Sequence, residues 1–228
     1  IALGPAGAPG GYAAAVDALE QAGVDSLWLP EMVYGPLVEP FIGMAYALSR
    51  TARLKVGTGI SVLPGRHPVL VAKQLASLDV LSKGRMRLFS VGVGALPGEA
   101  MAGGVDFATR GRRADEAIDV LRLLWDGDEN GVSFDGEFFS FTSLCSFPKP
   151  LARLPIHVGG SSPAAARRAG LRGDGYFPGG GLTEAERAAQ FDLMREAARA
   201  AGRDPAALEC TRWGAIDMTA DDVAAHAA

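Results

Sequence analysis

Short apolar runs alternate with amphipathic helical stretches along the 228 residues, and this alternation limits the fold more than any other feature of the sequence. Repeated strand–helix units of this kind form a parallel sheet that is covered by helices. Seven units can be counted. The expected strands are 1–4, 26–29, 54–60, 86–93, 156–158, 175–177 and 208–216. The expected helices are 9–22, 41–49, 68–81, 110–125, 163–170, 183–201 and 219–228.

This count predicts a single α/β domain over residues 1–228, a (β/α)8 TIM barrel whose eighth unit is missing from the chain. Because an open edge of buried character is unstable, we interpret the C-terminal end as cut or unobserved. One segment breaks the alternation, since residues 131–141 contain two β runs around the turn signal Asp135-Gly136. It precedes the fifth strand, so we expect a β-hairpin insertion there and not a barrel strand.

Composition and absent motifs exclude several classes of function. The net charge is -4 and the basic residues are scattered, which argues against a nucleic-acid partner. No apolar run reaches the roughly 20 residues of a membrane span, and no secretory signal precedes the first strand. Cys145 and Cys210 lack metal-ligand spacing and are expected as free thiols. Motifs of metallohydrolases, serine hydrolases and nucleotide phosphatases are also absent. We therefore expect a cytoplasmic protein without a metal site or a membrane contact.

The carboxyl ends of the strands are where a barrel places its active site. Glu31 follows the second strand and is a candidate to hydrogen-bond a ring or to act as a general acid or base; a solvated loop carboxylate is the alternative. Thr58, Gly59 and Ile60 end the third strand, where glycine permits the close approach of a flat ligand.

The next two strand ends are rich in glycine. Val93-Gly94 offers bare backbone to a ligand ring or simply relieves crowding at the rim. Pro97 stands where a dinucleotide fingerprint needs its last glycine, so that motif fails. The turn formed by Gly159, Gly160, Ser161 and Ser162 opens a helix. Its backbone amides and hydroxyls would hold a phosphate, and the alternative is that Ser162 only caps the helix.

Three further features have competing interpretations. His67 is a candidate base, but its place before a helix-starting proline favours local packing. The basic run 110–113 is either a solvated helix face or a contact for an anionic cofactor tail. Leu70, Leu75 and Leu78 lie on one helix and indicate either core packing, which we favour, or the contact of a homodimer.

Six stretches of sequence carry a family resemblance. They are GTGISVLPGRHPVLVAKQLASLDVLSKGRMRL, VGVGAL, FATRGRRADEAIDVLRLLW, GEFFSF, FPKP and IHVGGSSPAAARRAGLRGDGYFP, in this order along the chain. Together they resemble the luciferase-like monooxygenase family, and in particular its oxidoreductases that depend on the deazaflavin coenzyme F-420 (F420). The resemblance spans residue 1 to about residue 216.

The resemblance implies where a cofactor would lie. Gly59-Ile60 matches a position that often holds a non-prolyl cis peptide behind the central ring of the cofactor. Val93 and Gly94 match a second backbone wall, and the turn 159–162 matches a phosphate-binding turn. In the branch that binds FMN, an arginine that grips the FMN phosphate aligns with Val93, so its absence favours F420.

Two departures bear on the chemistry that the resemblance implies. Met32 stands where many relatives have a histidine, and Ala95 stands where sugar-phosphate-oxidising members have an acid. The resemblance implies hydride transfer between F420 and a small organic substrate, with Glu31 near the ring or the substrate. The alternatives are an FMN-dependent monooxygenase that uses O2 and a flavin reductase partner, and a non-catalytic barrel kept as a cofactor-binding or dimerisation scaffold.

Overall fold

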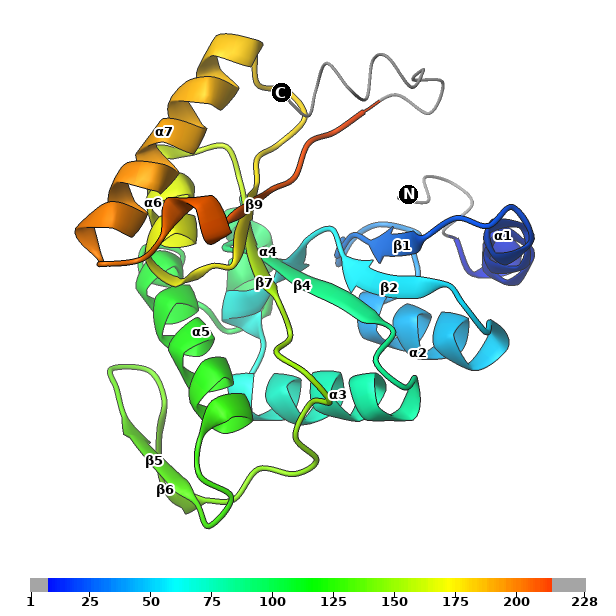
Figure 1. The fold of residues 1–228 in the computed structure, drawn as a ribbon, viewed down its shortest axis with the longest axis horizontal. Helices are drawn as coiled ribbons and strands as arrows, with labels where there is room; N and C mark the ends of the chain where they lie inside the picture. The colour runs from blue at the N-terminus through cyan, green and yellow to red at the C-terminus, as the bar shows by residue number, and fades with distance from the viewer. Residues whose placement is uncertain (1–7, 215–228) are drawn as a thin grey trace.

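The structure, a computed structural model, describes residues 8–214, so the expected strand 1–4 and the expected helix 219–228 lie outside the described residues. The helices in Figure 1 are α1 (Pro9–Gln21), α2 (Pro40–Arg50), α3 (Pro68–Leu81), α4 (Pro97–Ala102), α5 (Arg110–Asp126), α6 (Pro163–Arg172) and α7 (Glu184–Ala200), with 3-10 turns η2 (Leu63–Gly65) and η3 (Pro205–Ala207). The strands are β1 (Ser26–Leu29), β2 (Lys55–Thr58), β3 (Ser61–Val62), β4 (Met86–Gly92), β5 (Val132–Asp135), β6 (Ser140–Leu144), β7 (Ile156–Gly159), β8 (Gly175–Phe177) and β9 (Glu209–Cys210).

The main sheet is parallel throughout, in the order β1-β2-β4-β7-β8-β9, with β3 paired to β4. Its two sides approach each other because the sheet curves. Trp28 of β1 contacts Phe177 of β8, with ring centroids 5.5 Å apart, although three strands separate β1 from β8 in the sheet. Arg87 of β4 reaches Glu209 of β9 in the same way. The described sheet therefore forms part of a barrel wall, and its carboxyl strand ends share one rim.

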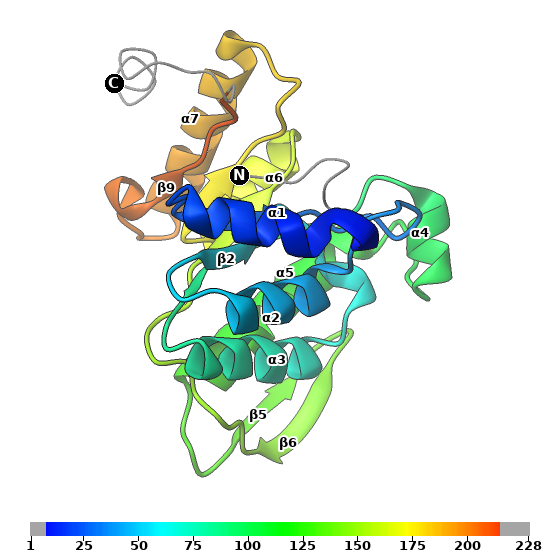
Figure 2. The same ribbon diagram turned by 90° about the vertical axis from the view of Figure 1, so that its right-hand side faces the viewer.

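The helices cover the outer side of this wall. In Figure 1 they follow one another along an arc from α1 through α2, α3, α5 and α6 to α7, and Figure 2 shows α1, α2 and α3 side by side. The core lies between helices and sheet, where Leu27, Met44, Leu75, Leu121 and Ile156 are fully buried. Burying one such side chain stabilises the fold by about 1.5–3 kcal/mol relative to leaving it exposed.

Local signals set the helix boundaries. Proline opens α1, α2, α3 and α6, where its missing N–H costs no hydrogen bond. Thr183 and Glu186 form the expected capping box at the start of α7. Ser162 accepts a hydrogen bond from the N–H of Ala165 at the start of α6.

The predicted hairpin insertion is confirmed, and it extends further than expected, because β6 continues to Leu144. The carboxylate of Glu116 on α5 accepts hydrogen bonds from the N–H groups of Phe138 and Phe139 in the hairpin loop. The hairpin projects beyond α3 and α5, away from the main sheet (Figure 2). It therefore packs on the outer side of α5 and contributes no strand to the main sheet.

Two predicted strands differ from the structure, and one helix was not predicted. The expected strand 54–60 is broken after Thr58, because the Gly59–Ile60 peptide is cis and the chain pairs again only at β3. The short helix α4 follows β4 without having been predicted, since its six residues are too few for a periodic apolar face. The expected strand 208–216 is reduced, within the described residues, to Glu209–Cys210.

The predictions for the surface met different outcomes. Leu75 is buried and Leu78 packs against the core, whereas Leu70 is 63% exposed, so a homodimer contact through Leu70 stays a prediction. Cys145 and Cys210 are free, as expected. Within residues 8–214, no helix is both long and apolar enough to cross a bilayer.

Candidate functional site

The break after β2 places a single side chain at the rim of the sheet. Ile60 lies against two neighbouring strand ends: a Cβ added to Gly159 would come within 2.5 Å of Ile60 Cγ2, and one added to Gly92 would overlap Ile60 Cδ1. Ile60, Gly92 and Gly159 therefore form one continuous surface, which we call the Ile60 wall. The structure brings together the predicted residues Gly59, Ile60 and Gly159, and it adds Gly92 to them.

Thr58 supports this surface from behind. Its side chain is buried, and its hydroxyl donates to the carbonyl oxygen of Ser90 at 2.7 Å. Because that bond joins β2 to β4 just below the break, Thr58 positions the segment that carries Ile60. A direct contact of its side chain with a ligand would need this bond to be given up.

Three aromatic rings border the wall. A Cβ on Gly59 would lie 3.7 Å from Cε1 of the Phe177 ring and 3.9 Å from Cε3 of the Trp28 ring. Phe177 also stacks on Trp213, with centroids 4.9 Å apart and an interplanar angle of 27°. These rings cannot be identified from the sequence, because the contact depends on curvature that brings β1 near β8.

Val93 and Gly94 continue β4 beyond the wall. Gly94 has a φ of +77°, which a side chain would disfavour, and its carbonyl oxygen accepts from Arg110 Nε at 3.3 Å. Both residues line a cavity of about 30 Å3 together with Val62. This space suits a water molecule, so it is a cleft beside the wall and not the main ligand site.

The turn after β7 has the features of an anion-binding site. Gly160 has a φ of +125°, and its carbonyl oxygen accepts from the Tyr176 hydroxyl at 2.7 Å. Burial raises the pKa of Tyr176 to about 12, so this hydroxyl stays protonated and keeps donating. Ser162 caps α6, and Ser161 lies against Gly179.

Several backbone donors of this turn have no partner within residues 8–214. Among the hydrogen bonds between described residues, none uses the N–H of Ser161, Ser162 or Ala164. Ser161 and Ser162 are exposed. Free amides at a helix N-terminus attract an anion, because the helix dipole adds to their hydrogen bonds. Capping by Ser162 and phosphate binding by the backbone are therefore compatible here.

The carboxylate of Glu31 is engaged in hydrogen bonds, unlike that of a free acid or base. Its Oε2 atom accepts from Ser61 Oγ at 2.6 Å, from the N–H of Val62 at 3.0 Å and from Arg66 Nε at 3.1 Å. Its own N–H donates to the carbonyl oxygen of Ile60 at 2.9 Å. Glu31 thus clamps residues 60–62 from the neighbouring loop. The prediction that it is catalytic stays a prediction, and the geometry favours a positioning role.

The other sequence candidates lie around this rim in packing roles. His67 is exposed and contacts Phe139 edge-on, with centroids 5.5 Å apart, which agrees with the local-packing interpretation. Arg113 donates to the carbonyl oxygen of Pro64, and Arg112 pairs with Glu137 on the surface. Of the run 110–113, Arg110 alone bonds to a predicted site residue, Gly94.

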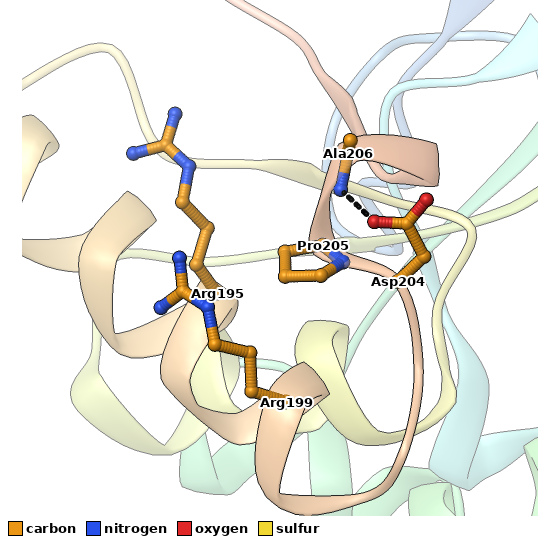
Figure 3. Close-up of a pocket in the computed structure, with 5 residues that line it drawn as sticks. All are labelled: Arg195, Arg199, Asp204, Pro205 and Ala206. Atoms are coloured by element: carbon orange, nitrogen blue, oxygen red, sulfur yellow. Dashed lines mark hydrogen bonds between the residues drawn. The ribbon is translucent and has the colours of Figure 1, made fainter.

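A larger pocket of about 390 Å3 lies elsewhere, and it is not the candidate site. Figure 3 shows Arg195 and Arg199 of α7 opposite Asp204 and Pro205. The carboxylate of Asp204 accepts a hydrogen bond from the N–H of Ala206 in its own turn. This pocket lies where the chain passes from α7 into β9, which is the end of the sheet opposite the carboxyl strand ends. Barrel active sites lie at the carboxyl strand ends.

The family assignment follows from a match over nearly the whole sequence. The family model described as luciferase-like monooxygenase matches residues 3–227. The chain belongs to this family. The wall at Ile60 and the turn at 159–162 are where the family resemblance implied cofactor contacts, and the expected cis peptide at Gly59–Ile60 is present.

Curated relatives within the family differ in cofactor. An uncharacterized protein of Mycobacterium tuberculosis is 41% identical over 146 residues, which cover 64% of this chain and 49% of that protein. The F420-dependent glucose-6-phosphate dehydrogenase of Beutenbergia cavernae is 34% identical over 89% of this chain and 68% of its own length. The FMNH(2)-dependent dimethylsulfone monooxygenase of Pseudomonas fluorescens is 39% identical over 66% of this chain and 41% of its own length. The chain spans about half the length of the mycobacterial relatives.

Solved structures of the family have the same fold. An F420-dependent secondary alcohol dehydrogenase matches with a TM-score of 0.78 and 25% identity, over 88% of this chain and 63% of that chain. The monooxygenase RslO1 from Streptomyces bottropensis matches with a TM-score of 0.77 and 26% identity, over 91% of this chain and 67% of that chain. The α/β fold with its parallel sheet is therefore that of luciferase-like TIM barrels.

Proposed function

We propose that this chain forms the cofactor-binding part of an oxidoreductase that transfers a hydride between F420 and a small organic substrate. The observation that carries the proposal is the Ile60 wall beside the turn 159–162. The wall offers backbone and one apolar side chain to a flat ring, and the turn offers free amides to a phosphate. Both belong to adjacent strand ends, so one elongated molecule can contact both.

The glycines at the carboxyl strand ends fit the flat ring of such a cofactor. A Cβ at Gly92 or Gly159 would fill the place that Ile60 takes, so only glycine permits this wall. The left-handed φ angles of Gly94 and Gly160 mark backbone that passes the rim without a side chain. These glycines follow two neighbouring strands, and together they leave a surface that a planar ring can approach closely.

The chain's own residues would bind and orient, while the redox chemistry comes from the cofactor. When bound, a deazaflavin supplies a carbon atom that accepts or donates a hydride. The amides of Ser161, Ser162 and Ala164 would hold an anionic group at the α6 N-terminus. Glu31 would keep residues 60–62 at a fixed height behind the ring, since its carboxylate bonds to Ser61 and Val62.

Val93 supports F420 over FMN in this proposal. The arginine that grips the FMN phosphate in the flavin branch has its counterpart at Val93, which carries no charge. The main alternative is an FMN-dependent monooxygenase with a reductase partner, and the FMNH(2)-dependent relative at 39% identity supports it. The second alternative is a scaffold that binds neither cofactor, which the apolar Met32 beside Glu31 would suit.

A pair of titrations tests the proposal. Purified protein is titrated with F420 and, separately, with FMN, and binding is measured by fluorescence and by calorimetry. We expect F420 to bind with a dissociation constant in the micromolar range and FMN to bind at least about tenfold more weakly, a difference of about 1.4 kcal/mol. Tighter binding of FMN would favour the monooxygenase. Binding of neither, with an intact circular-dichroism spectrum, would favour the scaffold.

A matched pair of variants tests whether Val93 sets the preference between F420 and FMN. Val93→Arg adds a cation at the rim, and we expect it to improve FMN affinity relative to F420 by about tenfold, as for one new charged hydrogen bond. Leu81→Arg adds the same cation at an 82% exposed position at the end of α3. The control should leave the ratio of affinities unchanged. Equal effects of both variants would show that overall charge, and not Val93, sets the preference.

A further inference from the structure

The loop between β1 and α2 lines an open cavity of about 330 Å3. This volume is within the range of cavities that hold small organic molecules, which begins at about 300 Å3. The loop follows β1 directly, so the cavity lies at the carboxyl end of that strand. It is separate from the pocket of Figure 3, which lies at the opposite end of the sheet.

Apolar side chains make up most of its lining. They are Met32, Val33, Leu37, Val38 and Pro40. Met32 is 55% exposed and Val33 is 62% exposed, and the next residue, Tyr34, is 64% exposed. Three consecutive large side chains left in contact with water are unusual on a protein surface and indicate a place where an apolar ligand or partner binds.

The charged groups of the cavity are paired with one another. Arg66 donates to Glu31 Oε2 at 3.1 Å and to Glu39 Oε1 at 2.5 Å. Its guanidinium also lies over the ring of Phe41, 4.3 Å from the centroid. Two carboxylates against one guanidinium leave the lining with a net charge of about -1 at neutral pH. Among the described residues, the lining therefore has no cation without a carboxylate partner, and its negative charge disfavours a carboxylate or a phosphate.

Glu31 connects this cavity to the Ile60 wall. The same carboxylate that lines the cavity bonds to Ser61 and Val62, and the N–H of Glu31 bonds to the carbonyl oxygen of Ile60. A molecule in the cavity would thus lie next to the segment that forms the wall. Glu31 is thus the residue through which a ligand in the cavity would be linked to the segment that carries Ile60.

We propose that this cavity, which we call the β1–α2 pocket, is the substrate site of the proposed oxidoreductase and that it selects an uncharged, largely apolar substrate. The proposal rests on the proposed function for the identity of the site as a substrate site. Its selectivity rests on the pocket's own residues. A sugar phosphate or another small anion does not suit this lining, because transfer of an anion from water to an apolar site needs a partner cation.

Two probes that differ in one group test the selectivity. 2-Octanone and 7-oxooctanoate have the same chain and the same carbonyl, but the second ends in a carboxylate. Each is added to the purified protein without cofactor, and its affinity is measured by saturation-transfer NMR. We expect 2-octanone to bind at least about tenfold more tightly, which corresponds to about 1.4 kcal/mol. Equal affinities, tighter binding of 7-oxooctanoate or binding of neither probe to the folded protein would overturn the proposal.

Two methionine variants locate the binding. Met32→Lys adds a cation to the pocket, and we expect it to reduce the preference for 2-octanone by about tenfold. Met101→Lys adds the same charge on α4, at a 77% exposed position outside the lining of the pocket. It should leave the preference unchanged. If both variants act alike, or if Met32→Lys dissociates an oligomer in sedimentation while probe binding persists, the pocket is not the probe site.

The cofactor titration separates the two proposals. If F420 and FMN both fail to bind while 2-octanone still binds selectively and Met32→Lys still reduces the preference, the proposed function is wrong and the selectivity of the pocket stands. If F420 binds and the probes do not discriminate, the function stands and the substrate class is wrong. The two failures therefore give different patterns in the same set of proteins.

Discussion

Where the strands of the main sheet end, Ile60 packs against bare glycine backbone, whereas where they begin, Arg87, His157 and Glu209 form a polar cluster. The surface at the carboxyl strand ends has few hydrogen-bonding groups of its own and leaves room for a ligand. The cluster at the beginning of the strands connects β4, β7 and β9 through polar contacts. Barrels of this kind usually carry the ligand site at the carboxyl strand ends and residues for stability at the opposite end, and the contrast between the two ends of this sheet agrees with that division.

The largest expected effect comes from adding one carbon at the wall. In Gly159→Ala the new Cβ would lie 2.5 Å from Ile60 Cγ2, and this methyl group is attached directly to the Ile60 Cβ, so the backbone of residue 60 must move. We expect the free energy of unfolding to fall by about 1–3 kcal/mol, as for other overpacked sites. We also expect F420 binding to weaken by more than tenfold. Urea titration and fluorescence titration measure the two effects.

A second substitution makes that test specific. Ile60→Ala in the Gly159→Ala background removes the colliding methyl group, so part of the lost stability should return. Gly10→Ala is the control, because a Cβ there has no neighbour within 4 Å. If the double variant is no more stable than Gly159→Ala alone, the contact between Ile60 and Gly159 does not account for the loss.

The carboxylates at the two ends should differ in their contribution to stability. Glu31 is 12% exposed and holds three donors, whereas Glu209 is 46% exposed and pairs with Arg87. We expect Glu31→Ala to lower the free energy of unfolding by about 1–3 kcal/mol, because Ser61 and Val62 lose their acceptor. Glu209→Ala should cost under about 1 kcal/mol, as for an exposed ion pair.

Chemical denaturation of the two variants tests this order. Glu129→Ala, at an exposed position in the turn before the hairpin, provides a reference near zero. Glu31→Gln then separates charge from geometry, and an unchanged turnover in that variant would remove Glu31 from the proton chemistry. Equal costs at Glu31 and Glu209 would mean that the clamp on residues 60–62 is no stronger than a surface pair.

The smallest expected effect is a pH dependence of the free energy of unfolding, which comes from His157 where the strands begin. Burial lowers the pKa of His157 below its usual 6.5; Glu209 and Asp174 act in the opposite direction, and Arg87 adds to the lowering. The unfolded chain therefore takes up this proton first as the pH falls below 6.5. Stability is complete above that value and decreases as the pH falls towards the folded-state pKa.

Urea titrations between about pH 7.5 and 5.5, on either side of the usual histidine pKa, measure this slope. We expect the wild-type protein to lose stability over this range and His157→Gln to lose less. Thr211, whose hydroxyl lies 3.3 Å from His157 Nδ1, also contacts the ring, so the variant is compared by slope and not by absolute stability. Parallel curves for the two proteins would rule out His157 as the source.

Local signals were predictable from the sequence because they need only neighbouring residues. The cap at Ser162, the capping box at Thr183 and the hairpin around Asp135-Gly136 each depend on a few consecutive positions. The breaks and bonds at the rim were not predictable in this way. Ser61 lies 30 positions from Glu31, and the sequence contains no local sign of the bond between them.

In the candidate site, too, local features were predictable and contacts between distant residues were not. The structure places Gly59, Ile60 and the turn 159–162 at one rim, while their role as cofactor contacts stays a prediction, and the sequence did not point to Gly92 or Tyr176. Gly92 belongs to the wall because Ile60, which follows a different strand, packs against it, and the sequence has no local sign of that contact. Tyr176 acts from the helix-facing side of β8, where its ring packs on Phe191, and a buried tyrosine in an apolar strand gives no separate signal in the sequence.

The aromatic border of the wall also gives the protein an optical reporter. Of its three tryptophans, Trp28 and Trp213 both contact Phe177 at the rim, while Trp125 is buried and donates to the carbonyl oxygen of Ala72. Trp213 is 45% exposed, so a molecule that covers the rim would remove water from its indole ring and shift its emission. Ligand binding at the rim can therefore be followed by intrinsic tryptophan fluorescence, without a label.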